Sequence, residues 1–308
     1  ASNGQQRWKA AISGGANKPS TTNGIVYVAT DTGDLYAINA GNILWHQSGG
    51  GLSSGITGRP GVANGLVVVA TGSGGIYAFD ANSGTQRWQY ATGSSINASV
   101  NLQSDGTLYV GCSDGYLYSL NAGSGSLRWR YQTAAAIEFT SPTVSNGMVY
   151  TGADDGNIYA LNTGDGSLKW KFQAGGQIFG KPAADSGSLY FGASDYYLYA
   201  IDAGNGHFLW KYKTGDSVTG SPAVANGLVY VSSGDQTLYA LHSNNGSPAW
   251  HFQRNGGFGL GRGWPVVTQG VLFIGAGDGQ VYALNAGNGS KVWSFSTGDP
   301  ASSPTIGQ

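Results

Sequence analysis

A few charged and aromatic side chains share one position of a repeated pattern, the residue that precedes a proline or its equivalent. In chain order that position holds Lys18, Arg59, Ser99, Ser141, Lys181, Ser221, Trp264 and Ser303. Close to it in the sequence are Asn97, Phe179, Arg262 and Glu138, the only glutamate of the chain. Cations beside aromatic and amide groups favour an anionic or hydrogen-bonding ligand. The alternative is that these are ordinary solvated loop residues.

Other residues that could perform chemistry do not form a recognisable set. His46, His207, His242 and His251 fall near strand ends of different repeats, without a metal-binding spacing. No Gly-x-Ser-x-Gly stands between a strand and a helix, and no helix could follow a phosphate loop. The only cysteine, Cys112, excludes an internal disulfide and a cysteine-rich metal site, and we interpret it as a small packed residue.

Composition narrows the classes of partner and compartment. The net charge is −1, only 10% of residues are charged, and no basic run favours nucleic acid or an anionic membrane. No apolar run approaches the roughly 20 residues of a membrane span. Few charges, many Asn, Gly and Ser, and a single cysteine predict an extracytoplasmic protein, and we expect it to be monomeric. Because the sequence starts at Ala1, either a signal peptide has been removed or the chain is an excerpt of a longer one.

Tryptophan recurs every 37 to 43 residues, which indicates one supersecondary unit copied along the chain. We expect these side chains to pack between neighbouring repeats, with each indole N–H bonded in the adjacent turn. They are Trp8, Trp45, Trp88, Trp129, Trp170, Trp210, Trp250 and Trp293.

One repeat, residues 142–170, shows four short strands joined by three turns. Its second and third strands contain Val149–Thr151 and Ile158–Leu161, which are rich in β-branched and aromatic residues. Asp155 and Gly156 between them suit a tight hairpin turn. Asp114 and Asp278 recur at the same hairpin position as Asp155, so we interpret all three as turn residues rather than calcium ligands.

Seven such hairpins predict an all-β fold, a β-propeller of four-stranded antiparallel blades. We expect residues 1–308 to form one domain of about seven 41-residue repeats with half-repeats at both termini. Seven blades are favoured, and eight if the chain is an excerpt. The segment Gly256–Pro265 departs furthest from the repeat, so we expect it to border any site.

The repeat resembles that of quinoprotein-dehydrogenase-like propellers. Its family mark, Ala-x-Asp-x-x-Thr-Gly-x-x-x-Trp, is the tryptophan docking motif. It is matched in part by Leu120–Trp129, Leu161–Trp170 and Leu284–Trp293, where Asn stands for Asp. In that family the pre-proline loops face the central channel at one end. The channel mouth would then hold Lys18, Arg59, Asn97, Glu138, Phe179, Lys181, Arg262 and Trp264.

The resemblance implies two kinds of function. Some members are alcohol dehydrogenases dependent on pyrroloquinoline quinone (PQQ). Others are non-catalytic, among them a lipoprotein of the outer-membrane β-barrel assembly machinery and sensor domains of bacterial kinases. In the enzymatic alternative, Glu138 would be a calcium ligand and Lys181 or Arg262 the basic partner of the quinone. The adjacent cysteine pair of those enzymes is missing, and they are roughly twice as long.

We therefore predict a non-catalytic scaffold or sensor that recognises a protein, peptide or small ligand, without a metal or cofactor. A carbohydrate-binding propeller remains a third hypothesis, because exposed Trp and Tyr with many Asn and Ser suit sugars. A sugar site in each blade would repeat one polar and aromatic set. The residues before proline instead differ from copy to copy, which favours one asymmetric site.

Overall fold

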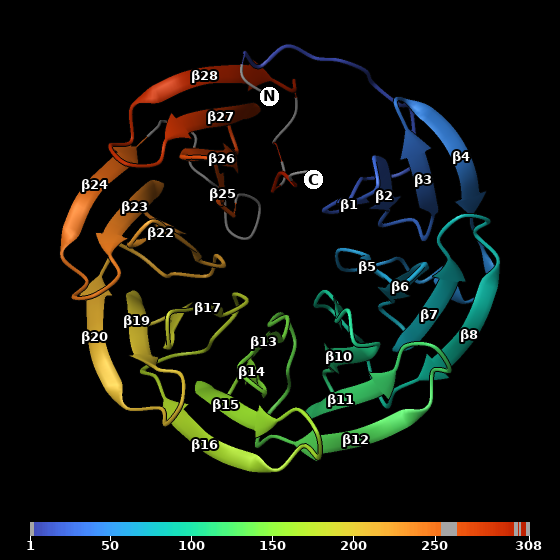
Figure 1. The fold of residues 1–308 in the computed structure, drawn as a ribbon, viewed down its shortest axis with the longest axis horizontal. Helices are drawn as coiled ribbons and strands as arrows, with labels where there is room; N and C mark the ends of the chain where they lie inside the picture. Colours follow the sequence, from blue (N-terminus) through green and yellow to red (C-terminus); the bar gives the residue numbers. More distant parts are fainter. Residues whose placement is uncertain (1–2, 254–263, 299–300, 302, 306–308) are drawn as a thin grey trace. The chain divides into compact units, whose positions relative to one another are not determined.

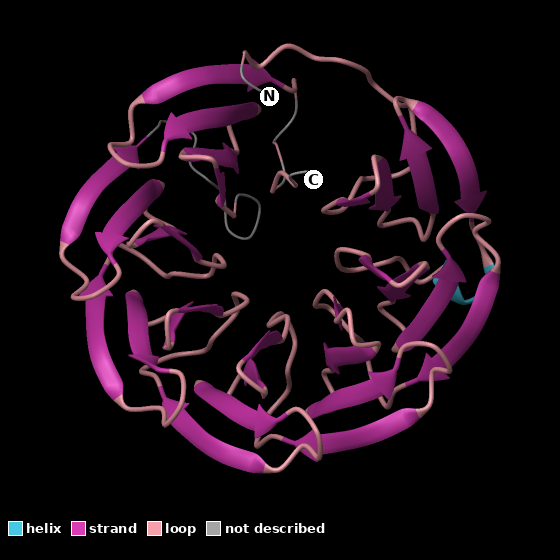
Figure 2. Cartoon of the chain, in the orientation of Figure 1, coloured by secondary structure: helices cyan, strands magenta, loops and turns pink. Residues whose placement is uncertain are grey.

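The computed structural model describes residues 3–253, 264–298, 301 and 303–305, and they form an all-β fold. Their only helical segment is the short 3₁₀ turn η1 (Gly50–Leu52) (Figure 2). The strands form seven four-stranded antiparallel sheets, each made of four consecutive strands in sequence order (Figure 1). The predicted fold class, a β-propeller with seven four-stranded blades, is confirmed.

The chain folds into two compact units. The first unit contains residues 6–142, 161–167 and 305–308. Its three sheets are blade 1 (β1–β4), blade 2 (β5–β8) and blade 3 (β9–β12). The strands are β1 (Ser20–Thr22), β2 (Ile25–Ala29), β3 (Leu35–Asn39), β4 (Asn42–Gln47), β5 (Gly61–Ala63), β6 (Leu66–Ala70), β7 (Gly75–Asp80), β8 (Gln86–Ala91), β9 (Asn101–Leu102), β10 (Thr107–Gly111), β11 (Tyr116–Asn121) and β12 (Leu127–Gln132).

The second unit contains residues 1–5, 143–160 and 168–304. Its sheets are blade 4 (β13–β16), blade 5 (β17–β20), blade 6 (β21–β24) and blade 7 (β25–β28). The strands are β13 (Thr143–Ser145), β14 (Met148–Gly152), β15 (Asn157–Asn162), β16 (Leu168–Gln173), β17 (Ala183–Asp185), β18 (Ser188–Gly192), β19 (Tyr197–Asp202), β20 (Phe208–Lys213), β21 (Ala223–Ala225), β22 (Leu228–Ser232), β23 (Thr237–His242), β24 (Pro248–Gln253), β25 (Val266–Thr268), β26 (Val271–Gly275), β27 (Gln280–Asn285) and β28 (Lys291–Ser296).

The second and third strands of each blade carry the core. In blade 3 all five residues of β10 are buried, and Thr107 pairs with Asn121 at the far end of the hairpin. The turn between these strands needs a left-handed residue, supplied by Gly115 at φ 82°. Fully buried apolar side chains from successive blades pack together, as Ile76 of blade 2 and Val110 of blade 3 do. Burial of these strands on both faces explains why their sequences are continuously apolar.

A tyrosine and a tryptophan of one blade converge on a carbonyl of the next. The indole N–H of Trp45 donates to the Ala81 oxygen at 2.9 Å, and the Tyr27 hydroxyl donates to the same oxygen at 3.2 Å. Their ring centroids are 5.9 Å apart. Corresponding tryptophan bonds, without exception 2.6–3.2 Å long, are made by Trp88, Trp129, Trp170, Trp210 and Trp250.

Each of these indoles also covers a glycine of the next blade's turn between its third and fourth strands. A Cβ on Gly246, whose φ is +71°, would lie 2.5 Å from Cε3 of Trp210. Trp293 covers Gly4 in the same manner. Trp8 lies against the Gly41 turn but is 41% exposed, so it is the least enclosed of the eight.

Candidate functional site

The pre-proline loops run from the fourth strand of one blade to the first strand of the next. Five of these loops, within the described residues, contain a buried apolar anchor, and the backbone N–H of several anchors bonds to the preceding blade. The Ile56 N–H donates to the Thr30 oxygen at 3.2 Å, and the Ile137 N–H to the Cys112 oxygen at 3.1 Å. Further anchors, none more than 1% exposed, are Ile96, Ile178 and Val218. The anchors fix where the next residues of each loop lie.

Serines at the pre-proline position join adjacent loops through a hydrogen bond that we call the serine clip. In the first unit, the Arg59 N–H donates to Ser99 Oγ at 2.9 Å, and the Ser99 N–H donates to Ser141 Oγ at 3.0 Å. In the second unit, two further clips join Lys181 to Ser221 at 2.8 Å and Trp264 to Ser303 at 2.9 Å. These four serines therefore have a structural role that Lys18, Arg59, Lys181 and Trp264 do not share.

In the first unit, the residues that directly follow the anchor positions also differ in whether their side chains form a hydrogen bond. Thr57 Oγ1 donates to the Ile96 oxygen at 2.5 Å, and Asn17 Nδ2 donates to the Ile56 oxygen. Asn97 and Glu138 stand at the same point of their loops and are half-buried. Within the described part of the chain, the side chains of Asn97 and Glu138 form no hydrogen bond. They are available for a ligand where Asn17 and Thr57 are not.

Lys18 and Arg59 precede β1 and β5, two strands that lie side by side in the first unit. Both side chains are half-buried. Burial, and then the neighbouring charge of Arg59, lower the pKa of Lys18 to about 7. Burial also lowers the pKa of Arg59. Among the described residues, the Arg59 guanidinium forms no ion pair or hydrogen bond.

The candidate residues of the second unit are two aromatic and two basic residues. Phe179 follows the Ile178 anchor and is half-buried, as is Lys181. Trp264 lies beside Gly220, where a Cβ would be 3.7 Å from its Cδ1 atom. Arg262 and most of the Gly256–Pro265 segment lie outside the described residues.

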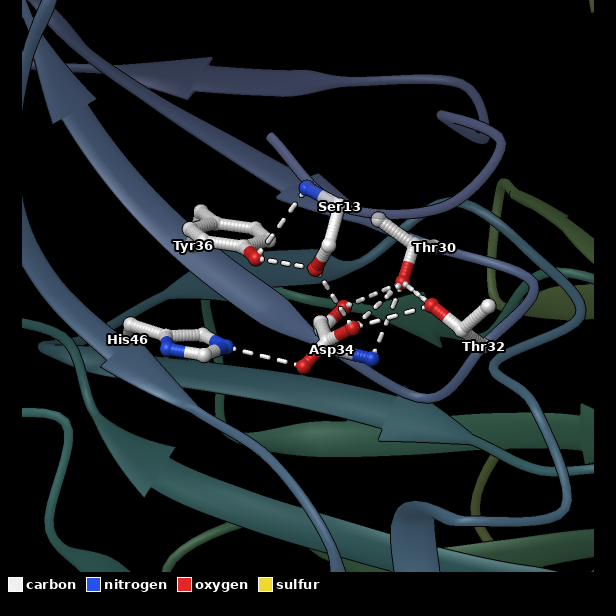
Figure 3. Close-up of polar contacts among 6 residues, drawn as sticks. All are labelled: Ser13, Thr30, Thr32, Asp34, Tyr36 and His46. Atoms are coloured by element: carbon white, nitrogen blue, oxygen red, sulfur yellow. Dashed lines mark hydrogen bonds and ion pairs between the residues drawn. The ribbon is translucent and has the colours of Figure 1, made fainter. Parts of the chain in front are cut away.

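A polar cluster in blade 1 was missed by the sequence analysis (Figure 3). Asp34 accepts hydrogen bonds from Ser13 Oγ at 3.0 Å and from Thr32 Oγ1 at 2.9 Å, and it pairs with His46 Nε2 at 2.8 Å. Tyr36 stacks on His46 with ring centroids 4.3 Å apart, and its hydroxyl lies 2.7 Å from Ser13 Oγ. The hydrogen bond with His46, followed by those from Thr32 and Ser13, lowers the pKa of Asp34.

This cluster does not have the arrangement of a nucleophilic triad. A serine is activated when histidine accepts its proton and a carboxylate orients that histidine. Here Ser13 and His46 both bond to Asp34, on different oxygens. The carboxylate therefore ties the segment before β1 to the hairpin of β3 and β4, which is a structural role.

In other blades an aspartate two positions earlier performs a related structural role. The Tyr118 hydroxyl donates to Asp114 at 2.6 Å, and the same carboxylate accepts the Tyr116 N–H. Asp155 and Asp278 bond in the same way to their own turns and to Tyr159 and Tyr282. No group of three or more His, Cys, Asp or Glu side chains in the described ranges could hold a metal ion.

Comparison with known proteins identifies the family. The family model described as outer membrane protein assembly factor BamB matches residues 1–140, 93–180, 135–221 and 178–307. The chain belongs to this family. No curated protein matches the sequence significantly.

Solved structures agree on the fold. BamB from Moraxella catarrhalis is 23% identical, with a TM-score of 0.81, over 94% of this chain and 90% of that chain. The computationally designed protein Ika8 is 15% identical, with a TM-score of 0.87, over 98% and 94%. The quinohemoprotein alcohol dehydrogenase ADHIIG from Pseudomonas putida HK5 is 15% identical, with a TM-score of 0.79, over 97% and 69%. At these identities the likeness establishes the fold alone.

Proposed function

We propose that this protein is a non-catalytic, extracytoplasmic scaffold that binds a protein partner through its pre-proline loops and takes part in the assembly of outer-membrane proteins. The family description supports the assembly role. The described residues contain no helix with the length and apolar character needed to cross a membrane. Loops on a rigid scaffold are the usual place for recognition residues.

The main support for the proposal is that the pre-proline residues fall into two groups, serines that join neighbouring loops and residues of other types. Ser99, Ser141, Ser221 and Ser303 join neighbouring loops, whereas the other pre-proline residues are two lysines, an arginine and a tryptophan. Asn97 and Glu138 likewise depart from the hydrogen bonds made by Asn17 and Thr57. Residues that differ from copy to copy and do not form these structural bonds suit one asymmetric partner.

The residues present do not fit PQQ with calcium. The one cysteine, Cys112, is fully buried between blades 2 and 3, so it cannot supply an adjacent pair. Glu138 belongs to no cluster of carboxylates within the described ranges. A calcium site for a quinone needs several oxygen ligands, and one isolated carboxylate does not provide them. This favours the scaffold over the dehydrogenase that shares its fold.

Site-specific photo-cross-linking in the producing cells tests partner binding. A photoreactive residue is introduced at Asn97 or Phe179 in the loops, and at Gln86 or Val292 on exposed fourth strands as matched controls. Discrete protein adducts from the loop positions, absent from the strand positions, are the expected result. Adducts from the strands alone would overturn the proposal that the loops bind the partner.

Calorimetric titration with PQQ, with and without calcium, tests the enzymatic alternative. We expect no binding heat at about 100 μM cofactor, where micromolar sites are saturated. Calcium-dependent binding that weakens in Glu138→Ala would contradict the non-catalytic role.

A further inference from the structure

We propose that the outer edge of strand β20 binds an extended acidic segment of another protein, which adds to blade 5 as a fifth strand. The segment would place two carboxylates opposite Lys211 and Lys213 of β20. This surface is separate from the pre-proline loops and goes beyond the proposed function. Its test therefore does not depend on partner binding by those loops.

Charges are separated on the fourth strands of the blades. The seven fourth strands together carry eight lysines and arginines, but they contain no aspartate or glutamate. The whole chain has 15 basic and 16 acidic residues, so composition alone does not explain this separation. A cationic edge repels the same edge of a second copy and attracts an acidic strand, so we assign the site to a different, acidic segment.

Strand β20 has an edge that can accept another strand. It is last in the sheet order β17-β18-β19-β20, so its outer edge pairs with no strand in the described part of the chain. An unpaired edge presents a row of backbone N–H and C=O groups, to which an extended peptide can bind as an added strand. Backbone pairing would supply the affinity, and the side chains beside it would supply the selectivity.

The two lysines of β20 stand on one face of this edge. Lys213 pairs directly with Tyr197 of β19. Lys211 pairs with Tyr199, two residues along the same face. Both lysines are exposed, and neither forms an ion pair among the residues that the structure describes. The Lys211 ammonium lies 4.1 Å from the centroid of the Tyr197 ring, and this contact helps to hold the charge in place.

An exposed apolar side chain extends the same face. Phe208 pairs with Ile201 and is 53% exposed. Leu209 has no partner in this register, and the resulting bulge puts Phe208 on the face of the two lysines. An antiparallel segment that fits this face therefore has acidic residues at alternate positions, followed by an apolar residue. Opposite charges on directly facing residues of adjacent strands stabilise their pairing.

Strand β16 in blade 4 offers a matched comparison. It is also the last strand of its sheet, and it carries two lysines, Lys169 and Lys171. When the strands are aligned on their tryptophans, only Lys171 matches a lysine of β20, since Gln173 stands where β20 has Lys213. A strand added to β16 would therefore meet one of the two lysines that it would meet on β20.

Titration with labelled peptides tests the site. The acidic probe is Thr-Glu-Thr-Glu-Thr-Leu-Thr with an N-terminal dye, read by fluorescence anisotropy, and the basic probe has Lys in place of both Glu. We expect the wild type to bind the acidic probe at least about fivefold more tightly than the basic one. In the double variant Lys211→Glu with Lys213→Glu this preference should reverse, because each facing pair changes sign. Lys169→Glu with Lys171→Glu makes the same change in net charge and should retain the preference.

The outcomes separate strand recognition from net charge and from misfolding. A reversed preference is a gain of binding that a misfolded variant would not show. No binding of the acidic probe by the wild type would overturn the proposal, and the lysines would then only protect the edge from aggregation. An equal change in the two double variants would overturn the assignment to β20, because net charge alone would account for it.

Hydrogen exchange distinguishes a fifth strand from loose attraction. At saturation, the acidic probe should slow exchange of backbone amides in β20 by at least about tenfold. The control is β24, an outer strand that contains neither lysine nor arginine and whose exchange should not change. Binding without slower exchange in β20 would overturn strand addition. Cross-linking from the loops at position 97 or 179 tests the proposed function separately, so either idea can fail while the other stands.

Discussion

The turns that face the tryptophans and the pre-proline loops are both repeated in successive blades, but they differ in what is repeated. In the turns the chemistry is nearly invariant, since Trp170 and Trp210 cover Gly206 and Gly246 in the same way. In the loops the backbone plan recurs and the side chains do not. Arg59 and Ser99 occupy equivalent positions and both donate a backbone N–H to the next serine, but only Ser99 has a side chain that accepts such a bond. Invariant chemistry marks the positions that hold the blades together, and variation marks the positions free to recognise a partner.

The pre-proline loops of the two units carry different types of side chain. The first unit places two cations, an amide and a carboxylate there, and the second adds Phe179 and Trp264 to Lys181. Buried aromatic side chains and arginine are the residues that contribute most to protein interfaces. We therefore expect the first unit to supply electrostatic selectivity and the second to supply apolar contact.

The largest effect is expected from Gly246→Ala in an invariant turn. A Cβ there would lie 2.5 Å from Trp210, at a φ of +71° that disfavours alanine. We expect a loss of about 2–4 kcal/mol in the free energy of unfolding, since the indole has to shift. Urea denaturation followed by tryptophan fluorescence measures it.

Gly227→Ala is the matched control for that substitution. Gly227 has a φ of +76° but open space around the position of a Cβ. Its loss should be about 1 kcal/mol, from backbone conformation alone. Equal losses for the two variants would show that contact with the indole does not hold the blades.

A smaller effect is expected from the pH dependence set by Lys18. The protonated side chain is disfavoured in the folded protein, where its pKa is about 7, relative to about 10.5 in the unfolded chain. Between these values the unfolded state binds more protons, so stability should rise as the pH rises from about 7 to about 9.5. The gain should be on the order of 3 kcal/mol, and Lys18→Met should flatten it.

Stability should stop rising above about pH 9.5, because ionisation of tyrosines that are buried in the folded protein lowers stability as the pH rises further. Burial, and then the hydrogen bond to Asp195, raise the pKa of Tyr199 to about 12, so stability falls once unfolded tyrosines ionise above about 10. Unfolding midpoints at pH 7, 8 and 9.5 for wild type and Lys18→Met test this. Parallel profiles for the two proteins would contradict the assignment to Lys18.

Loss of a serine clip should lower the free energy of unfolding by less than Gly246→Ala does and by less than the pH effect of Lys18. Ser99→Ala removes the acceptor of the Arg59 N–H and should lower stability by about 1 kcal/mol. Arg59→Met keeps the clip and removes only a charge, so its stability should not fall. A greater loss in Arg59→Met than in Ser99→Ala would reverse the division between structural and recognition residues.

The blades could be predicted from sequence because their strands and turns are local. Segments such as Leu117–Asn121 combine β propensity with a glycine turn, and the tryptophan spacing sets the repeat. The loop positions could be predicted because each precedes a proline or its equivalent.

The serine clips could not be predicted, since each joins an N–H and a hydroxyl about 40 residues apart, and only blade pairing brings them together. The Asp34 cluster was not predicted from the sequence for a similar reason. Its aspartate is displaced by two positions from those of the other hairpins, and Ser13 lies 21 residues before it. The family resemblance already implied one channel mouth for Lys18 and Arg59, and the strands that follow them, β1 and β5, lie side by side in the first unit.

The smallest effect is expected in a different turn, the one between the second and third strands of blade 5. Tyr196 in blade 5 has a φ of +77°, at the point where Gly115 and Gly156 stand in blades 3 and 4. The Thr214 N–H and hydroxyl both donate to the Tyr196 oxygen at 2.9 Å and hold this conformation. Because its side chain is 44% exposed, little packing offsets the strain.

Tyr196→Gly should therefore raise the free energy of unfolding by about 0.5–1 kcal/mol. The reciprocal Gly115→Tyr should lower it, since that glycine has a φ of +82°. A loss of stability in Tyr196→Gly would show that the ring packs more than its exposure suggests. A gain would place Tyr196 with the varied loop residues, as a side chain kept in a strained turn for recognition, and a cross-linker at position 196 would then test whether the partner reaches blade 5.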